Sequence, residues 1–337
     1  MNYVELGDSG IEVSRVCVGG MSFGDRASKM HAWTLDVAAT DAMVAHALEL
    51  GINFFDTANC YSDGTSEEYL GAAIARHVRR EEVVLASKVY FNEGRLSAAA
   101  IEREIEGTLR RLGTDYLDLY IIHRFDYDTP IEETCEALDA LVRAGKVRAL
   151  GASAMFGYQF HKMLTYQYRH GLAHFVSMQD HYNLVQREDE REMIPVCREY
   201  GVSLTPYSSL AAGRLARPDW HAKTLRSDTD VVARSKYDGT EEADKLVAAR
   251  VRELAERRGV SMTEVALAWH YAKGVASPII GSTRPEQYDD AARACELGLS
   301  AEEVAFLEEP YVPHWPAGPR LADGSSFGAV VLDPLKK

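Results

Sequence analysis

Short apolar runs alternate with amphipathic stretches along most of the chain. The apolar runs read as strands, because they are rich in β-branched and aromatic residues and too short for helices. In chain order they are VCVGG, INFFD, VVLASK, YLDLYIIH, VRALGAS, FVSMQD, VSLTPYS and SPIIGS. These runs are continuously apolar, as expected for strands of a parallel sheet that is covered on both faces.

The stretches between these runs have the period of amphipathic helices. Their approximate bounds are 36–50, 65–76, 98–112, 130–144, 158–168, 188–200, 241–257 with 262–271, and 285–295. Glycine follows several of them, as expected at helix C-caps. Thr65 and Glu68 predict a capping box at the start of the second stretch. The pattern therefore predicts a strand-helix unit repeated eight times.

This repeat predicts an α/β fold, a single (β/α)8 TIM barrel formed by one domain over residues 1–337. The opening YVELGDSGIEVSR predicts an N-terminal hairpin that turns at residues 8–10. An open doubly wound sheet is the alternative, but VCVGGMSFG lacks the GxGxxG spacing expected after its first strand. Residues 20–35 and 210–240 are predicted to be long rim loops, and hence candidate lids.

Composition narrows the class of protein. Hydrophobic residues make up 46% of the chain and charged residues 26%, which is typical of a globular protein with a large core. The net charge of −14 disfavours nucleic acid and anionic membranes as partners. The cysteines are scattered without CxxC spacing, so we expect neither disulfides nor a metal site. With no leader or membrane-spanning run in the pattern, a cytoplasmic location is expected.

Polar residues stand at the ends of three neighbouring predicted strands. Asp56, Lys88 and His123 end the second, third and fourth strands, and Tyr61 follows the second. Because the carboxyl ends of barrel strands meet at one rim, we expect these four side chains to share a pocket. One polar residue at a strand end is usually a cap or a core group, whereas four on consecutive strands favour an active site.

The charges of these four residues suggest their roles. The Lys88 ammonium is expected to favour the Tyr61 phenolate and so lower the pKa of Tyr61. Asp56 is placed to pair with Lys88, whose burial would otherwise be costly. His123 can donate a hydrogen bond to a carbonyl oxygen while Tyr61 supplies a proton. Such a site suits a carbonyl whose oxygen gains negative charge, as in hydride addition.

The segments FFDTANCYSDG, LASKVY, LRRLGTDYLDLYIIH and IIGSTRPEQ resemble the aldo/keto reductase superfamily over nearly the whole chain. HAWTL, HRFDYDTPIEETCEAL and FVSMQDHYNL are most similar to its branch of bacterial YajO-like proteins and fungal aryl-alcohol dehydrogenases. The resemblance implies NADPH-dependent reduction of an aldehyde or ketone: a sugar, a sugar phosphate or an aromatic carbonyl. It identifies Asp56, Tyr61, Lys88 and His123 as a catalytic tetrad, with Tyr61 as the proton donor.

The same resemblance implies a set of NADP(H)-binding residues. Ser153 and Gln179 match residues that hold the nicotinamide carboxamide, and Tyr207 matches the aromatic residue that stacks on the nicotinamide ring. The pyrophosphate segment carries Ser208, Leu210, Gly213 and Leu215, and the adenosine-phosphate segment carries Gly281, Thr283, Arg284 and Gln287. Together with GST, the Arg284 cation at a predicted helix start favours NADP over NAD, because it can pair with a 2′-phosphate.

Some positions depart from the family pattern or carry no fixed role. Related sequences place other residues at Ala154, Ser209, Ala212 and Ala291, which puts cofactor affinity in question. Candidates for the substrate pocket, which could equally be packing residues, lie on rim loops: Trp33, Phe91, Arg124, His181 and Trp220.

Two other functions are compatible with the same residues. A phenol and an ammonium can move protons without hydride transfer, as in the isomerisation or dehydration of a sugar phosphate, and the YajO likeness suggests 1-deoxyxylulose 5-phosphate formation. A regulatory NADP-binding module with little turnover is the third reading. Consumption of the cofactor distinguishes carbonyl reduction from isomerisation or dehydration. The natural substrate, the physiological direction and the oligomeric state do not follow from the sequence.

Overall fold

The computed structural model describes residues 1–28, 30–221, 223–316 and 318–322. Eight parallel strands form one sheet in the order β10-β3-β4-β5-β6-β7-β8-β9. They are β3 (Cys17–Gly19), β4 (Phe54–Asp56), β5 (Val84–Val89), β6 (Leu117–Ile122), β7 (Val147–Ser153), β8 (Phe175–Gln179), β9 (Ser203–Leu204) and β10 (Ile279–Ile280). Every predicted strand is therefore confirmed.

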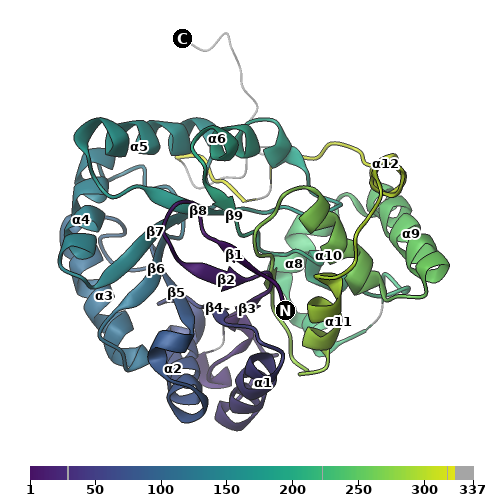
Figure 1. Ribbon diagram of the computed structural model, residues 1–337, viewed down its shortest axis with the longest axis horizontal. Coiled ribbons are helices and arrows are strands. Elements are labelled where there is room, and N and C mark those ends of the chain that lie inside the picture. The colour runs from purple at the N-terminus through teal and green to yellow at the C-terminus, as the bar shows by residue number, and fades with distance from the viewer. Residues whose placement is uncertain (29, 222, 317, 323–337) are drawn as a thin grey trace.

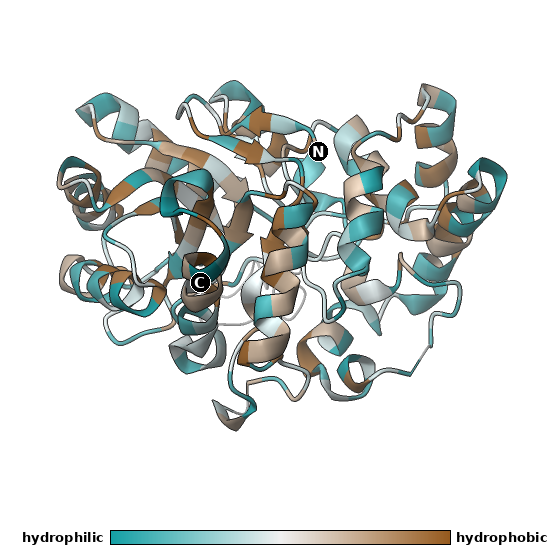
Figure 2. Cartoon of the chain, turned by 60° about the horizontal axis from the view of Figure 1, so that its bottom comes forward, coloured by the Kyte–Doolittle hydropathy of each residue, from teal (hydrophilic) through white to brown (hydrophobic). Residues whose placement is uncertain are grey.

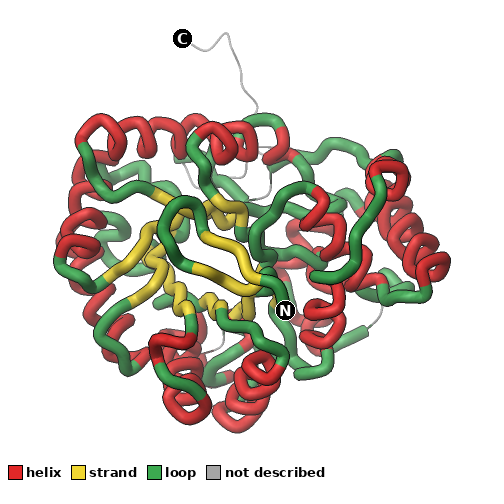
Figure 3. Tube along the Cα trace, viewed as in Figure 1, coloured by secondary structure: helices red, strands yellow, loops and turns green. Residues whose placement is uncertain are grey.

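Hydrogen bonds between the β9 and β10 regions close this sheet into a barrel. The Ala276 amide donates to the Leu204 carbonyl at 3.0 Å, and the Ile279 amide donates to the Pro206 carbonyl at 2.9 Å. The Ser209 hydroxyl adds bonds to the carbonyls of Pro206 and Ile279 at 3.0 and 3.3 Å, which gives this departure from the family pattern a structural role. The predicted (β/α)8 barrel is confirmed, and its strands lie inside a ring of helices (Figure 3).

The predicted helices cover the outside of the barrel. They are α1 (Val37–Glu49), α2 (Thr65–His77), α3 (Ala98–Leu112), α4 (Ile131–Arg143), α5 (Gly157–His170), α6 (Met193–Glu199), α9 (Glu241–Arg258), α10 (Met262–Ala272) and α11 (Gln287–Ala294). The capping box predicted for α2 is wrong, because Gly64 is the N-cap, with φ of +88°, and no side chain caps the helix. The Thr65 hydroxyl instead donates to the Ser62 carbonyl at 2.7 Å.

Three further helices did not follow from the apolar pattern. The predicted loop 210–240 contains α7 (Leu225–Thr229) and α8 (Val231–Tyr237), and α12 (Ala301–Glu308) follows the barrel. All three begin at residues whose side chains accept a bond from a backbone N–H of the first turn: Thr224, Asp230 and Ser300. Such caps are readable in a sequence. The helices α7 and α8 were missed because they are too short to show a helical period.

The predicted N-terminal hairpin is confirmed as β1 (Tyr3–Glu5) paired antiparallel with β2 (Glu12–Ser14). It lies across one end of the barrel (Figure 1). Leu6, Ile11 and Val13 of this hairpin join the apolar cluster inside the barrel, and the Gly7 amide donates to the Ser203 hydroxyl at the start of β9. The hairpin therefore closes the amino-terminal end of the barrel, so that ligands have access from the carboxyl-terminal rim.

Most of the hydrophobic core lies between the sheet and the helices, with a smaller cluster inside the barrel. Figure 2 shows hydrophobic residues on the strands and hydrophilic residues on the outer helix surfaces. Gly71 lets α2 approach α3 closely, because a Cβ there would lie 2.3 Å from the Leu112 carbonyl oxygen. None of the helices in the described residues is long and apolar enough to cross a membrane.

Candidate active site

Strand periodicity explains why three of the four predicted catalytic residues meet at the rim. Phe54 of β4, Ala86 of β5 and Ile121 of β6 belong to the cluster inside the barrel. Residues two positions further along the chain of a strand point to the same face. Those residues, at the carboxyl ends of the same strands, are Asp56, Lys88 and His123.

Asp56 and Lys88 form a buried ion pair with 3% and 0% of their surfaces exposed. The Lys88 ammonium lies 2.5 Å from Asp56 Oδ1 and donates to the Thr57 carbonyl at 2.7 Å. The second oxygen of Asp56 accepts a bond from the Gln179 side-chain amide at 2.9 Å. Burial lowers the pKa of Lys88, but Asp56 and Tyr61 outweigh this effect and raise it above its ordinary value. Lys88 is therefore a fixed positive charge under the site.

The Tyr61 hydroxyl lies above this charge, 3.4 Å from the Lys88 ammonium. Burial raises the pKa of Tyr61 to about 12, and the opposing effect of Lys88 is smaller. The expected net lowering of the Tyr61 pKa is wrong, because desolvation of the phenolate outweighs the neighbouring ammonium. Tyr61 consequently keeps its proton at neutral pH, as a proton donor must.

His123 is neutral in this setting. Burial, Lys88 and Arg124 hold the pKa of His123 well below its usual range. Its Nδ1 lies 3.9 Å from the Cys60 sulfur, and burial raises the pKa of the Cys60 thiol to about 11. A thiol that keeps its hydrogen can donate it to Nδ1. The imidazole hydrogen then belongs on Nε2, from which it can be donated to a carbonyl oxygen.

Strained backbone gathers at the predicted site. Among the described residues, the non-glycine residues with positive φ are Ser62, Asp63, Arg95, Ala154, Ser208, Ala211 and Ala212. All but Arg95 are predicted site residues or lie within two positions of one. Left-handed conformations at such residues cost free energy and cluster at functional sites.

The residues predicted to face the nicotinamide lie on the same rim as the tetrad. Ser153 and Gln179 are register partners at the ends of β7 and β8. The Tyr207 amide donates to the Asp180 carbonyl at 2.9 Å, which joins the residues after β8 and β9. The Tyr207 ring stacks on the His181 ring, with centroids 5.2 Å apart and an interplanar angle of 10°.

The predicted pyrophosphate segment forms a tight turn that includes the 3-10 helix η6 (Ala211–Gly213). The Arg217 Nε donates to the Gly213 carbonyl at 3.2 Å, and a Cβ on Gly213 would lie 2.6 Å from the Arg217 guanidinium. Gly213 has φ of +92°, a conformation that favours glycine at the point where this cation meets the backbone. Ser208, Leu210 and Leu215 lie in the same turn, which the Leu215 amide closes by donating to the Leu210 carbonyl at 3.3 Å.

Positive charge accumulates beside this turn. Burial lowers the pKa of Arg217, and so do Arg214, Arg226 and Arg284. No carboxylate of the described residues forms an ion pair with Arg217. The sequence analysis had not identified Arg217 as a candidate site residue. The adjoining cavity is lined by Ala212, Arg214, Arg217, Trp220, Arg226, Ser227, Asp230, Ala233 and Arg234. Guanidinium groups and consecutive backbone amides of a strained turn suit phosphate oxygens, so these residues fit the phosphates of a dinucleotide.

The predicted adenosine-phosphate segment opens α11. Gly281, Thr283 and Arg284 are exposed, and a Cβ on Gly281 would meet nothing within 4 Å. Ser282, another residue missed from the sequence, bonds the Gln287 side chain and accepts from the Arg284 amide at 3.2 Å. Ala291 is fully buried in the core, so the departure there concerns packing of α11.

Two of the predicted pocket residues border the tetrad directly. The Phe91 ring is 50% exposed and meets His123 edge-on, with centroids 5.0 Å apart. The Arg124 guanidinium lies 5.6 Å from the Phe91 centroid.

The other three pocket candidates lie in the two long rim segments, 20–35 and 210–240, or contact them. Trp33, 4% exposed, lies 4.4 Å from the Arg226 guanidinium, and Trp220 lies 5.6 Å from that of Arg214. His181, also 4% exposed, places Nε2 2.8 Å from the Tyr237 hydroxyl. Segments 20–35 and 210–240 therefore meet through Trp33 and Arg226.

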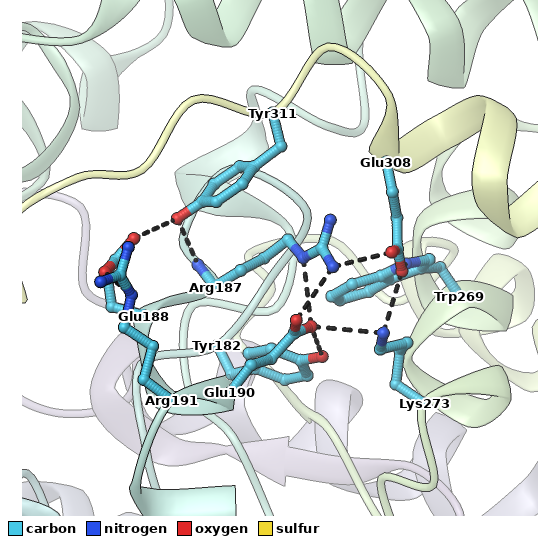
Figure 4. Close-up of polar contacts among 9 residues, drawn as sticks. All are labelled: Tyr182, Arg187, Glu188, Glu190, Arg191, Trp269, Lys273, Glu308 and Tyr311. Carbon is cyan, nitrogen blue, oxygen red and sulfur yellow. Dashed lines mark hydrogen bonds and ion pairs between the residues drawn. The ribbon is translucent and has the colours of Figure 1, made fainter.

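The chain after α12 is fixed to the segment that follows β8 (Figure 4). The Tyr311 hydroxyl accepts from the Arg187 amide at 3.0 Å and donates to Glu188 at 2.8 Å. Arg187 also pairs with Glu308 at 2.7 Å, in a network completed by Tyr182, Glu190, Arg191, Trp269 and Lys273.

Further on, the C-terminal segment reaches the rim beside the tetrad. The Gly318 carbonyl accepts a hydrogen bond from Arg124 at 2.8 Å, and the Arg320 carbonyl accepts one from the Tyr127 hydroxyl at 2.9 Å. A Cβ on Gly318 would lie 2.9 Å from the Tyr207 hydroxyl. The sequence after residue 310 has no periodicity from which this position could be predicted.

A buried carboxyl pair beneath the rim predicts a pH dependence of stability. Neither oxygen of Asp180 has a donor among the described residues, and its carboxyl is in hydrogen-bonding contact with that of Asp189. Burial raises the pKa of Asp180 well above its usual value and that of Asp189 to about 7. One proton shared by the two carboxyls satisfies both.

Because these pKa values are raised on folding, the stability from this pair is present below about pH 4 and lost as pH rises through about 7. Asp180→Asn replaces the shared proton by a permanent N–H donor. We expect the variant to melt a few degrees above the wild type at pH 8 and no higher at pH 5, measured by thermal unfolding. A lower Tm than wild type at both pH values would contradict the shared proton.

The chain belongs to the aldo/keto reductase family, whose family model matches residues 15–311. It is an oxidoreductase of that family, and the family predicted from the sequence motifs is confirmed.

Individual relatives match over nearly the full length. The versiconal hemiacetal acetate reductase of Aspergillus parasiticus is 39% identical over 93% of this chain and 98% of its own length. An aldo-keto reductase of Alternaria alternata is 40% identical, with 94% and 93% covered. A Schizosaccharomyces pombe protein whose name places it among the aryl-alcohol dehydrogenases is 39% identical, with 91% and 95% covered. The predicted likeness to aryl-alcohol dehydrogenases is thus confirmed.

Proposed function

We propose that this protein reduces an aldehyde or ketone with NADPH, with Tyr61 as the proton donor. The observation that carries the proposal is the buried Lys88–Asp56 ion pair, which holds a positive charge 3.4 Å from the hydroxyl of a protonated tyrosine. The names of the two reductases among the relatives support the reaction class. Carbonyl-dependent oxidation of NADPH, measured by its absorbance, tests the proposal.

The geometry supports the proposed roles of the tetrad, and the family resemblance supports those of the cofactor-binding residues. NADPH, when bound, supplies the hydride. His123 donates from Nε2 to the substrate carbonyl oxygen and orients it, while the Tyr61 hydroxyl transfers its proton to that oxygen. The phenolate left on Tyr61 is stabilised by the Lys88 ammonium, and Asp56 keeps Lys88 in place. Ser153 and Gln179 would hold the carboxamide of the cofactor, and Tyr207 would stack on its ring.

Arg284 predicts the choice of cofactor. Its exposed guanidinium lies near Arg217 at the opening of α11, where a 2′-phosphate can accept charge-assisted hydrogen bonds. We expect Arg284→Ala to weaken NADPH binding by about 10- to 100-fold and NADH binding far less. Fluorescence titration of each cofactor measures this, with the exposed Arg169→Ala as a matched control. An equal loss for both cofactors would exclude a 2′-phosphate contact.

The remaining predictions concern the whole chain. We propose that residues 1–337 act as one aldo/keto reductase-type domain, although residues 323–337 lie outside the described part. The partner is a small-molecule carbonyl substrate. The cytoplasmic location stays a prediction.

A further inference from the structure

Arg124 places a cation beside the tetrad without an acidic partner. It follows His123 directly, and its guanidinium lies over the Phe91 ring that packs on His123. Its side chain donates to the backbone carbonyl of Gly318 at 2.8 Å, and no carboxylate of the described residues forms an ion pair with it. A neutral carbonyl leaves most of the guanidinium donors, and all of its charge, uncompensated.

Lys236 of α8 brings a second such cation to the same place. Its ammonium lies 4.5 Å from the centroid of the Tyr207 ring, and it has no hydrogen bond or ion pair to the residues that the structure describes. Burial and, to a smaller extent, Arg124 lower the pKa of Lys236 to about 8 against the opposing effect of Asp230. Asp230 itself pairs with Arg226 at 3.1 Å, so it does not neutralise Lys236.

The local charge is therefore opposite in sign to that of the chain as a whole, which is −14. Arg124, Arg226 and Arg320 are all close enough to repel the Lys236 ammonium. Holding Arg124 and the partly desolvated Lys236 together, when neither has an ion pair among the described residues, costs free energy, and a low-dielectric cleft of one sign attracts ligands of the other. The arrangement is typical of a site that receives an anion.

The position of this pair separates it from the segments expected to bind the cofactor phosphates. Those segments contain Gly213 and Gly281, and they carry Arg217 and Arg284 as their cations. Arg124 and Lys236 instead lie against Phe91 and Tyr207, which border the place expected for the substrate carbonyl.

We propose that Arg124 and Lys236 bind an anionic group of the substrate, a carboxylate or a phosphate monoester, while the substrate carbonyl lies between Tyr61 and His123. The substrate class is then an acidic aldehyde or ketone. This inference rests on the proposed function, because it takes the tetrad to be the site of carbonyl reduction.

Matched charged and neutral substrates test the inference. The pairs are 4-carboxybenzaldehyde with its methyl ester, and glyceraldehyde 3-phosphate with glyceraldehyde. For the wild type we expect kcat/KM to favour the charged member by about 10- to 100-fold in at least one pair. Arg124→Gln and Lys236→Gln should each reduce that ratio about tenfold, mainly through KM, whereas Lys236→Arg should retain most of it.

Arg252→Gln is the matched control, because it removes one exposed positive charge from α9, where Arg252 pairs with Glu256. It should leave the ratio unchanged. A preference in the carboxylate pair alone assigns a carboxylate, a preference in the phosphate pair alone assigns a phosphate, and a preference in both supports a shared anion site.

A second readout is the pH dependence of the ratio of kcat/KM between charged and neutral substrates. A residue with a purely structural role would not change this pH dependence. The Lys236 ammonium loses its charge as pH rises through about 8, so the wild-type preference should fall across that range and the preference of Lys236→Arg should not. The charged and titratable groups that face Lys236 are Arg124, His181, Tyr207, Arg226, Asp230 and Arg320.

The outcomes separate this inference from the proposed function. Equal use of charged and neutral substrates by the wild type would overturn the anion site while leaving reduction intact. Absence of NADPH oxidation with every carbonyl would overturn the proposed function itself. If a variant fails to fold, inhibition of the wild type by benzoate and by inorganic phosphate decides: competition with a neutral aldehyde supports the site, and lack of competition by both anions contradicts it.

Discussion

Lys88→Met is expected to abolish carbonyl reduction and to lower the free energy of unfolding by about 3–5 kcal/mol. The substitution leaves the Asp56 carboxylate buried with 3% of its surface exposed and without its cation. It also removes the positive charge that would stabilise the Tyr61 phenolate. Chemical denaturation measures the stability, and NADPH oxidation with an aldehyde measures the activity.

The double variant Asp56→Asn/Lys88→Met separates these two effects. Removing both charges eliminates the unpaired carboxylate, so we expect most of the lost stability to return. Activity should stay absent, since no cation remains beside Tyr61. A single variant as stable as the wild type would show that the ion pair is not buried as described, and an active double variant would exclude the role of Lys88 in catalysis.

Tyr61→Phe is expected to reduce kcat by about 10²- to 10⁴-fold, the usual contribution of a general acid. The change removes one oxygen, and the ring can keep its edge-to-face contact with His123, whose centroid lies 5.8 Å away. We therefore expect the fold and the Kd for NADPH to be unchanged. Single-turnover kinetics and cofactor titration measure the two quantities.

A Tyr61→Phe variant with wild-type turnover would assign the proton donor elsewhere. Phe91→Leu is a useful companion, because it alters the other aromatic ring on His123 without removing a proton donor. A large loss in Phe91→Leu together with an active Tyr61→Phe would point to His123 as the group that supplies the proton.

Sequence patterns were sufficient for the barrel and for the meeting of the four tetrad residues. Continuous apolar runs and intervening helical periods specify a parallel barrel, and the period of two along a strand places Asp56, Lys88 and His123 on its inner face. Local periodicity and the meeting of strand ends at one rim are enough to predict both features.

Desolvation and long-range contacts were not predictable in the same way. The pKa of Tyr61 depends on how deeply the phenol is buried. Burial raises this pKa, whereas the charge of Lys88 alone was expected to lower it. The Asp180–Asp189 contact likewise joins the end of one predicted strand to the start of the predicted helix 188–200.

The position of the C-terminal segment and the two cations Lys236 and Arg217 were missed for a related reason. Arg124 contacts Gly318 across a separation of 194 residues, and Lys236 reaches Tyr207 from α8, a helix too short for a periodic signal. Arg217 stands in a turn whose left-handed residues, Ala211 and Ala212, have no sequence signature of that conformation.

The most direct test of the central claim follows NADPH loss and product formation together, in wild type and Tyr61→Phe, with a panel of aldehydes, ketones and sugar phosphates. The account predicts one alcohol formed for each NADPH consumed by the wild type, and near-complete loss of both in Tyr61→Phe. Sugar phosphates rearranged or dehydrated without NADPH consumption would contradict it and assign the tetrad to proton transfer alone.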